Sequence, residues 1–159
     1  MDWGVHSLSI SKYFPFCNSQ RESFFDTYAK LTLEQLDWQA PGSKNSIGFC
    51  LRHIAQSEDW FVNYIILGRE VPLKRRAELP TITEILDYLR ETRNNTMDLL
   101  NTLDESELPS LRTLGEGFRG NARETTVHWI LNRIFEHESY HYGQVNLMMK
   151  QQDIEPPNL

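Results

Sequence analysis

Apolar residues recur at helical spacing in four segments of the chain, and the strict alternation typical of β-strands is nearly absent. The four predicted helices span residues 19–36, 47–67, 82–103 and 123–151. Each has one apolar face, and helices of this kind bury such faces against one another. The sequence therefore predicts an all-α fold, a four-helix bundle, with residues 1–159 forming a single domain.

Local signals place the ends of these helices. Ser19 lies at the start of the first, Ser46 is a candidate N-cap for the second, and Gly68 ends the second. Thr81 and Glu84 have the spacing of a capping box at the start of the third helix. The boundaries thus follow from capping chemistry as well as from the apolar pattern.

Two segments lack helical periodicity. Residues 1–17 mix aromatic residues and proline, and we expect an irregular N-terminal extension that lies on the bundle. Residues 104–122 form a long irregular connection containing Gly115, Gly117 and Gly120. Because no Gly-Lys-Ser/Thr follows these glycines, a phosphate-binding loop is not favoured. We expect this connection to lie at the rim of a site, since long loops are often functional.

Composition and charge exclude several classes of protein. The chain has 159 residues, is 40% hydrophobic and 24% charged, and carries a formal net charge of −6. Binding to a phosphate backbone requires clustered Lys and Arg. The densest basic run is residues 74–76, which we interpret as a solvated loop. We expect no nucleic acid among the partners.

Sequence signals for export and for the membrane are missing. The first residues contain no basic region followed by an apolar run, and no stretch approaches the ~18 apolar residues of a membrane span. Cys17 and Cys50 lie far apart in the sequence and fit reduced thiols. We therefore expect a cytoplasmic protein that does not contact a membrane.

The buried face predicted for the last helix carries two imidazoles. His137 and His141 fall on one apolar stripe, whereas His128 lies on the opposite side. The stripe also contains Val127, Ile130, Ile134, Val145 and Met148. Histidines at positions i and i+4 lie about 6 Å apart, which suits one metal ion. A hydrogen-bonded pair is the alternative, but two neutral imidazoles in a core need partners that a metal supplies.

The second predicted helix offers a third histidine. Its buried arc is centred on Cys50, Ile54, Phe61 and Ile65, and its polar side is marked by Arg52, Gln56, Asp59 and Asn63. His53 and Glu58 both lie at the flanks of the buried arc. His53 is the best candidate for a third ligand from another helix. An ionisable pair at these positions indicates a site. The alternative for Glu58 is that it is the partner of a buried donor, such as an arginine or an imidazole N–H.

Residues 137–141 also match the HExxH motif of zincin metalloproteases. Zincins need a further ligand downstream, but Leu147 stands where a third histidine is expected and Glu155 lies beside two prolines. No sheet is predicted for binding a peptide. Glu138 and His141 also match half of a di-iron carboxylate site, which requires two such motifs. Both interpretations are less favoured than a site with three histidines.

Two stretches resemble helices of the DinB/YfiT-like family. These are SIGFCLRHIAQSEDW at residues 46–60 and WILNRIFEHESYHYGQ at residues 129–144. The family pattern in the second stretch is close to H-x-x-H-H-R-G-Q. This chain keeps the outer histidines and the Gly-Gln pair, but has Tyr140 in place of the inner histidine and Tyr142 in place of the arginine.

The resemblance implies a four-helix bundle that holds one divalent ion through His53, His137 and His141, often as a homodimer. Some relatives are thiol-dependent transferases or isomerases. Imidazole ligands suit Zn or Ni, with Fe, Mn and Cu as further options. Three histidines leave a coordination position open for water or a thiol.

Three functions follow for this chain. The first is a metal-dependent thiol S-transferase or hydrolase acting on a small-molecule substrate or a low-molecular-weight thiol. In that enzyme Glu138 is a candidate general base and Glu58 an outer partner of a ligand. The second is a non-catalytic metal-binding bundle with a stress-response or interaction role, favoured by the changes at Tyr140 and Tyr142. The third, less favoured, is the zincin.

Overall fold

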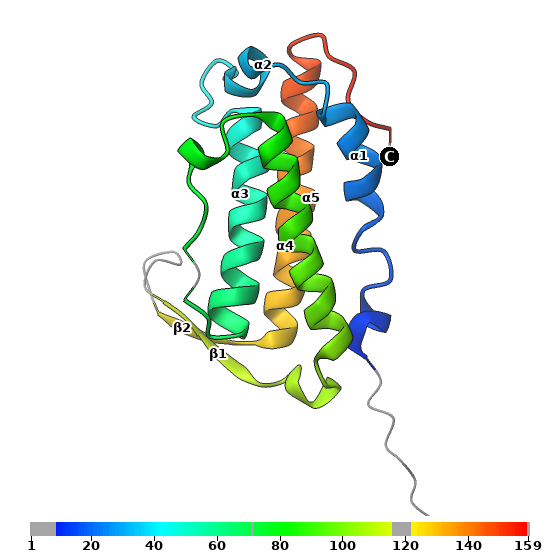
Figure 1. Cartoon of the computed structure of the whole chain (residues 1–159), viewed down its shortest axis with the longest axis vertical. Helices are drawn as coiled ribbons and strands as arrows, with labels where there is room; N and C mark the ends of the chain where they lie inside the picture. Colours follow the sequence, from blue (N-terminus) through cyan, green and yellow to red (C-terminus); the bar gives the residue numbers. More distant parts are fainter. Residues whose placement is uncertain (1–8, 71, 116–121, 159) are drawn as a thin grey trace, which may run out of the picture.

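The structure is a computed structural model that describes residues 9–70, 72–115 and 122–158. Its main helices are α1 (Ser19–Tyr28), α3 (Ile47–Asp59), α4 (Ile82–Thr102) and α5 (Val127–Lys150), arranged side by side (Figure 1). The short helices are η1 (Ile10–Tyr13), α2 (Leu33–Asp37), η3 (Arg76–Glu78) and η4 (Glu105–Glu107). This arrangement confirms the predicted all-α bundle.

The helices begin where the sequence supplies caps. Ser46 accepts a hydrogen bond from the backbone of Phe49 at the start of α3, and Thr81 and Glu84 form a capping box at the start of α4. The predicted first helix is two helices, since Thr32 forms a second capping box that starts α2. Beyond Asp59, α3 continues as a π-helix, η2 (Trp60–Ile66), and Gly68 adopts a positive φ of 65° after it.

The prediction missed a small sheet. Strands β1 (Leu111–Leu114) and β2 (Arg123–Thr126) pair in antiparallel register at one end of the bundle (Figure 1). The predicted connection over 104–122 is therefore not wholly irregular, and the last helix begins at Val127, not at residue 123. Strands of four residues are too short for alternation to reveal them. Gly117 and Gly120 lie outside the described residues.

Helices α3 and α4 run in the same direction, antiparallel to α5 (Figure 1). Helix α3 packs against both α4 and α5. This explains an error in the predicted polar side of this helix, because Arg52, Asp59 and Asn63 are buried. Asp59 accepts hydrogen bonds from Asn63 and from the Tyr88 hydroxyl on α4.

The apolar core consists of two clusters. One fills the end of the bundle near α2, and the other fills the end near the sheet. Ile10 is fully buried in the second cluster, so the described part of the N-terminal extension packs on the bundle as predicted. His6 lies outside the described residues. Between the clusters lies a layer of buried charged side chains, which is described with the site below.

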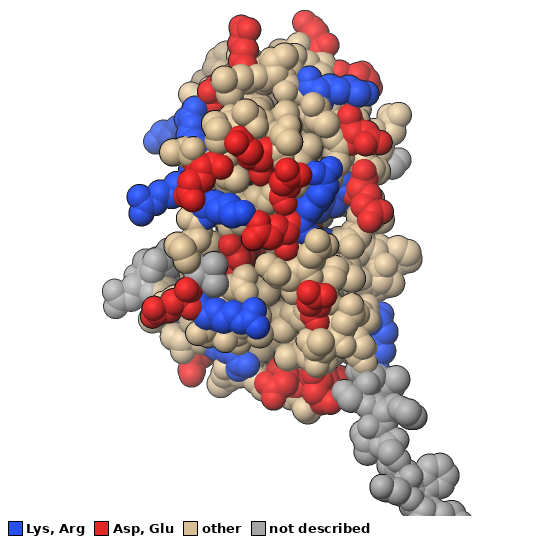
Figure 2. All heavy atoms as spheres, viewed as in Figure 1, with Lys and Arg blue, Asp and Glu red and all other residues tan. Residues whose placement is uncertain are grey.

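On the face shown in Figure 2, acidic and basic side chains are intermixed. Exposed ion pairs among the described residues include Lys74–Glu91 and Arg90–Asp87. No helix among the described residues combines the length and apolar character needed to cross a membrane.

Candidate metal centre

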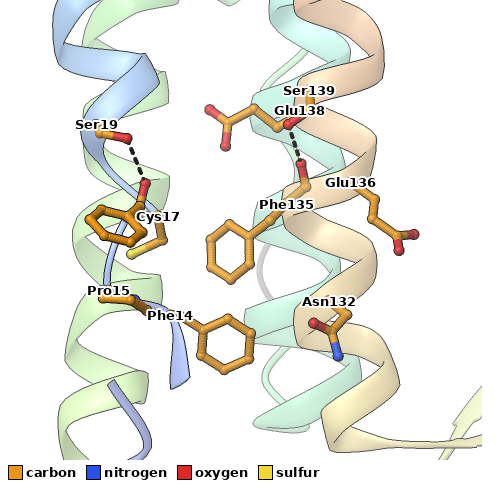
Figure 3. Close-up of a pocket in the computed structure, with 10 residues that line it drawn as sticks. Phe14, Pro15, Cys17, Ser19, Asn132, Phe135, Glu136, Glu138 and Ser139 are labelled. Carbon is orange, nitrogen blue, oxygen red and sulfur yellow. Dashed lines mark hydrogen bonds between the residues drawn. The ribbon is translucent and has the colours of Figure 1, made fainter. Parts of the chain in front are cut away.

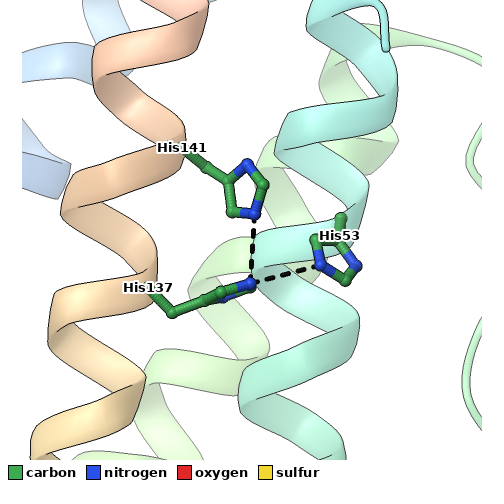
Figure 4. A group of neighbouring side chains, drawn as sticks. All are labelled: His53, His137 and His141. Atoms are coloured by element: carbon green, nitrogen blue, oxygen red, sulfur yellow. Dashed lines mark hydrogen bonds between the residues drawn. The ribbon is translucent and has the colours of Figure 1, made fainter. Parts of the chain in front are cut away.

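Three histidines from two helices converge between α3 and α5 (Figure 4). His137 and His141 lie one turn apart on α5, and His53 faces them from α3. The Nε2 atom of His137 is 3.2 Å from Nε2 of His53 and 3.0 Å from Nε2 of His141. The structure thus brings together the three residues that the sequence singled out, whereas His128 is exposed on the other side of α5.

The geometry of these nitrogens fits one cation. Two imidazole ligands of a tetrahedral Zn²⁺, each about 2.0–2.1 Å from the ion, lie about 3.3 Å apart. The spacings of 3.0 and 3.2 Å are close to this value. An imidazole Nε2 carries either one proton or one lone pair, so the central nitrogen of His137 cannot donate to one neighbour and accept from the other. A cation at the point of convergence satisfies all three lone pairs.

Neighbouring side chains orient the rings. Nδ1 of His141 lies 2.7 Å from Oε1 of Gln144. A side-chain oxygen accepts, so Nδ1 carries the proton and Nε2 keeps its lone pair. Ser57 Oγ is 3.5 Å from Nδ1 of His53, and the Phe49 ring stacks on the same imidazole with centroids 5.5 Å apart. The role of Gln144 was not predicted, although its place three residues after His141 is a usable signal.

The surroundings keep all three imidazoles neutral. Burial lowers the pKa of His53, His137 and His141. The pKa of His137 falls to about 3, through burial first and then through His141, His53 and the positive charge of Arg133. Neutral imidazoles at physiological pH have the free lone pairs that coordination requires.

A pocket opens directly beside the histidines. It has a volume of about 510 Å³, within the usual range for small-molecule sites. His53 and His137 form part of its wall. The remaining lining residues are Gln56, Ser57, Trp60, Phe61, Leu73 and Arg133. A small molecule in this pocket therefore contacts the histidines directly.

Glu58 and Glu138 belong to a separate cluster of buried charges. Arg21 Nε and Nη2 lie 2.6 Å from oxygens of Glu138 and Glu58 respectively. Arg93 also donates to both carboxylates, 2.8 Å from Glu58 Oε1 in one of these contacts, and Thr96 donates to Glu58. All four charged side chains are at most 7% exposed. This charged cluster separates the two apolar clusters of the core.

The cluster changes the roles expected of both glutamates. Burial alone raises the pKa of Glu58, but the guanidinium groups of Arg21 and Arg93 outweigh it and bring that pKa to about 2. Glu58 is thus the partner of buried arginines, one of the two options that the sequence left open. Glu138, the candidate general base, has both oxygens occupied by arginine N–H groups. The structure therefore provides no contact between Glu138 and the histidines.

A second cavity lies between the N-terminal segment and α5 and contains none of the three histidines (Figure 3). Its volume is about 650 Å³, and the rings of Phe14 and Phe135 line it with their centroids 5.2 Å apart. Cys17 also lines it, but burial raises the pKa of that thiol, which disfavours a reactive thiolate. Cys17 and Cys50 are both free, as predicted.

The two tyrosines at the altered family positions differ in their surroundings. Tyr140 is 63% exposed, and its hydroxyl accepts a hydrogen bond from Gln144 beside the histidines. Tyr142 is buried, and its ring packs between Phe24 and Tyr28. Tyr142 is therefore a core residue here, while Tyr140 lies at the edge of the site.

A helical bundle with three histidines converging between two of its helices defines a class of candidate metalloproteins. The family model of the DinB superfamily matches residues 18–145, and the chain belongs to this superfamily. The crystal structure of a DinB-like protein from Bacillus cereus ATCC 10987 is similar, with a TM-score of 0.68 and 18% sequence identity. The match covers 94% of this chain and 95% of that chain, and it shows the shared fold. No curated protein sequence matches.

Proposed function

We propose that this protein binds one divalent transition metal ion through His53, His137 and His141 and uses it as a metal-dependent transferase or hydrolase. The observation that carries the proposal is the convergence of three imidazoles from two helices, whose candidate ligand nitrogens all lie within 4.8 Å of one another. Neutral imidazoles favour Zn or Ni, followed by Fe, Cu and Mn. Structural zinc sites usually have four protein ligands, so a site with three retains a position for a reactant.

When bound, the ion lowers the pKa of a coordinated water or thiol and so supplies a nucleophile near neutral pH. The residues of the chain orient the histidine ligands and position the second reactant. Gln144 holds His141 in the required tautomer, and the pocket beside His53 and His137 positions the second reactant. In the thiol reaction, the sulfur forms a bond to an electrophilic carbon, the leaving group departs with the bonding electrons, and the thiol proton goes to solvent.

The pocket favours an enzyme over a bundle that only binds metal, because a metal held for structural reasons needs no cavity of this size beside it. The protease interpretation loses support, since the glutamate of the HExxH motif pairs with Arg21 and Arg93. A low-molecular-weight thiol and a small electrophile are the proposed reactants, with a cytoplasmic homodimer as the proposed form.

Metal analysis of purified variants tests the metal site. We expect close to one ion per chain in the wild-type protein and in His128→Ala, and loss of the ion in His53→Ala, His137→Ala and His141→Ala. His128 is the matched control because it is an exposed histidine on the same helix. Full metal retention in the three variants would remove the basis of the proposal.

A screen of low-molecular-weight thiols against small electrophiles, with and without chelator, then tests catalysis. Metal-dependent consumption of the thiol supports the transferase, and metal-dependent consumption of esters or amides without thiol supports the hydrolase. A fully metal-loaded protein that turns over neither class of reactant would favour the non-catalytic function.

A further inference from the structure

One cation of the metal pocket, Arg133, has no ion-pair partner among the described residues. Arg133 lies on α5, one turn before His137, and is half-buried in the wall of the pocket of about 510 Å³. It makes no hydrogen bond or ion pair with any residue that the structure describes. In contrast, each of the buried Arg21 and Arg93 contacts two carboxylates. A half-buried guanidinium with five donors and no acceptor is suited to binding an anion.

The charges around the pocket favour the same kind of ligand. The described residues that line it include no Asp or Glu, so none of these side chains neutralises the charge of Arg133. Arg133 lies close to the histidines, because it lines the same pocket as His53 and His137. An ion bound by the histidines adds a second positive charge to the same cavity. Opposite charge in a confined pocket is attracted strongly.

The other wall of the pocket is apolar. Trp60 and Phe61 begin the π-helix η2, and Leu73 lies in the segment that precedes α4. Aromatic and aliphatic side chains of this kind bind the apolar body of a ligand, while a single charged group fixes its orientation. The pocket therefore combines one anion-binding group with an apolar surface beside the three histidines.

We propose that this pocket binds a small organic acid, whose carboxylate pairs with Arg133 and whose apolar body lies against Trp60 and Leu73. This inference rests on the proposed function in one respect, since it takes the acid to be a reactant at the metal. Arg133 is then the residue that determines the substrate class. A guanidinium pairs with a carboxylate through two parallel hydrogen bonds, which a neutral amide of the same shape cannot replace.

Two probes of the same shape test the proposal. 3-Phenylpropanoate carries the carboxylate, and 3-phenylpropanamide replaces it with a neutral group. Dissociation constants are measured by NMR titration of the Trp60 indole signal in zinc-loaded and in chelator-treated protein, with zinc content determined on each sample. The proteins are the wild type, Arg133→Gln and Lys150→Gln. Lys150 is the matched control, because it is an exposed cation at the far end of the same helix.

We expect the wild type and Lys150→Gln to bind the acid at least about tenfold more tightly than the amide, as a charge-assisted hydrogen bond predicts. In Arg133→Gln the preference should fall below about threefold, with the affinity for the amide and the zinc content unchanged. Part of the preference should persist in the wild type without zinc.

Two results would overturn the proposal. One is that Arg133→Gln still binds the acid more tightly than the amide. If Arg133→Gln shows this preference only in zinc-loaded protein, the carboxylate binds to the metal and not to Arg133. The other is a wild-type protein that does not distinguish acid from amide. Failure of the proposed metal site is recognised separately, because the zinc content would then be the same in the wild type and in the three histidine variants. In that case, the dissociation constants of the acid for chelator-treated wild type and chelator-treated Arg133→Gln still decide whether Arg133 binds the acid.

Discussion

The side-chain oxygen of Gln144 lies 2.7 Å from Nδ1 of His141, and this contact fixes which nitrogen of the imidazole faces the other two histidines. The amide nitrogen of Gln144 in turn donates to the hydroxyl of Tyr140, which holds the amide in one orientation. An acceptor on the outer ring nitrogen also makes the inner nitrogen a stronger base.

Replacing Gln144 with leucine should therefore weaken metal binding without removing a ligand. We expect the affinity for zinc to fall about 10- to 100-fold, the range found for such outer contacts. Competition with a chromophoric chelator measures the change. Asn132→Leu is the control, because Asn132 is an exposed amide on the same helix that bonds only to the backbone of His128 among the described residues. Equal zinc affinity in both variants would contradict this role for Gln144.

The sequence was most informative where the signal was local. His137 and His141 lie one turn apart in one helix, so their shared face follows from helical geometry alone. His53 required a guess that α3 would face α5, and its position at the flank of the buried arc supported that guess. Gln144 could have been found by the same local argument, since it follows His141 by three residues.

The features that the sequence did not reveal depend on contacts between distant residues. The sequence analysis did not single out Arg21, because its burial between two carboxylates depends on contacts of α1 with α3 and α5. The helical pattern likewise predicts that Asp59 faces solvent, whereas Asp59 accepts a hydrogen bond from Tyr88 on α4. The helical pattern of one segment does not show that other helices pack on two of its sides, and so it does not show that both sides are buried. The short strand pair had too few residues to show a pattern.

The buried charged cluster should respond strongly to the loss of one member. Glu58→Gln leaves the guanidinium groups of Arg21 and Arg93 with Glu138 as their one remaining carboxylate partner among the described residues. We expect a loss of about 3–5 kcal/mol in the free energy of unfolding, as for other broken buried ion pairs. Urea denaturation followed by circular dichroism measures it.

Glu91→Gln is the control for this measurement, since Glu91 pairs with Lys74 where both side chains are exposed. Exposed ion pairs contribute at most about 1 kcal/mol. If the two glutamates proved equally important for stability, the cluster would not hold the bundle together in the way that its burial indicates.

The metal-free protein should lose stability as the pH falls from 7 to 5. The pKa of His137 is lowered from 6.5 to about 3 in the folded state, so in this interval the unfolded chain binds a proton that the folded chain does not. Stability attributable to His137 is therefore present above its ordinary pKa of 6.5 and is lost as the pH falls below it. Glu58 titrates outside this interval, because its pKa lies below its ordinary value of 4.5.

Thermal denaturation of chelator-treated protein across this interval measures the effect. His137→Asn should reduce the pH dependence of the free energy of unfolding by up to about 1 kcal/mol per pH unit. His128→Asn should leave the dependence as in the wild type, because His128 is exposed to solvent. Identical pH profiles for the wild type and His137→Asn would mean that the imidazole is not held neutral by its surroundings.

The hydroxyl of Tyr142 is buried near Glu138 but forms no hydrogen bond of ordinary geometry among the described residues, whereas the hydroxyl of nearby Tyr28 donates to Asn146 at 2.9 Å. A buried polar group without a partner costs free energy that an apolar group of the same shape avoids. Tyr142→Phe should therefore leave the stability unchanged or raise it by about 1 kcal/mol, while Tyr28→Phe should lower it by about 1 kcal/mol.

The two tyrosines form a matched pair for this test, because their rings pack against each other with centroids 5.9 Å apart and both substitutions remove one hydroxyl. Chemical denaturation of the two variants gives the comparison directly. Metal content should be unchanged in Tyr142→Phe, because its ring packs in the apolar core and not against the histidines. A loss of metal in Tyr142→Phe would instead connect this altered family position to the site, through Glu138 and the charged cluster that the Tyr142 hydroxyl approaches.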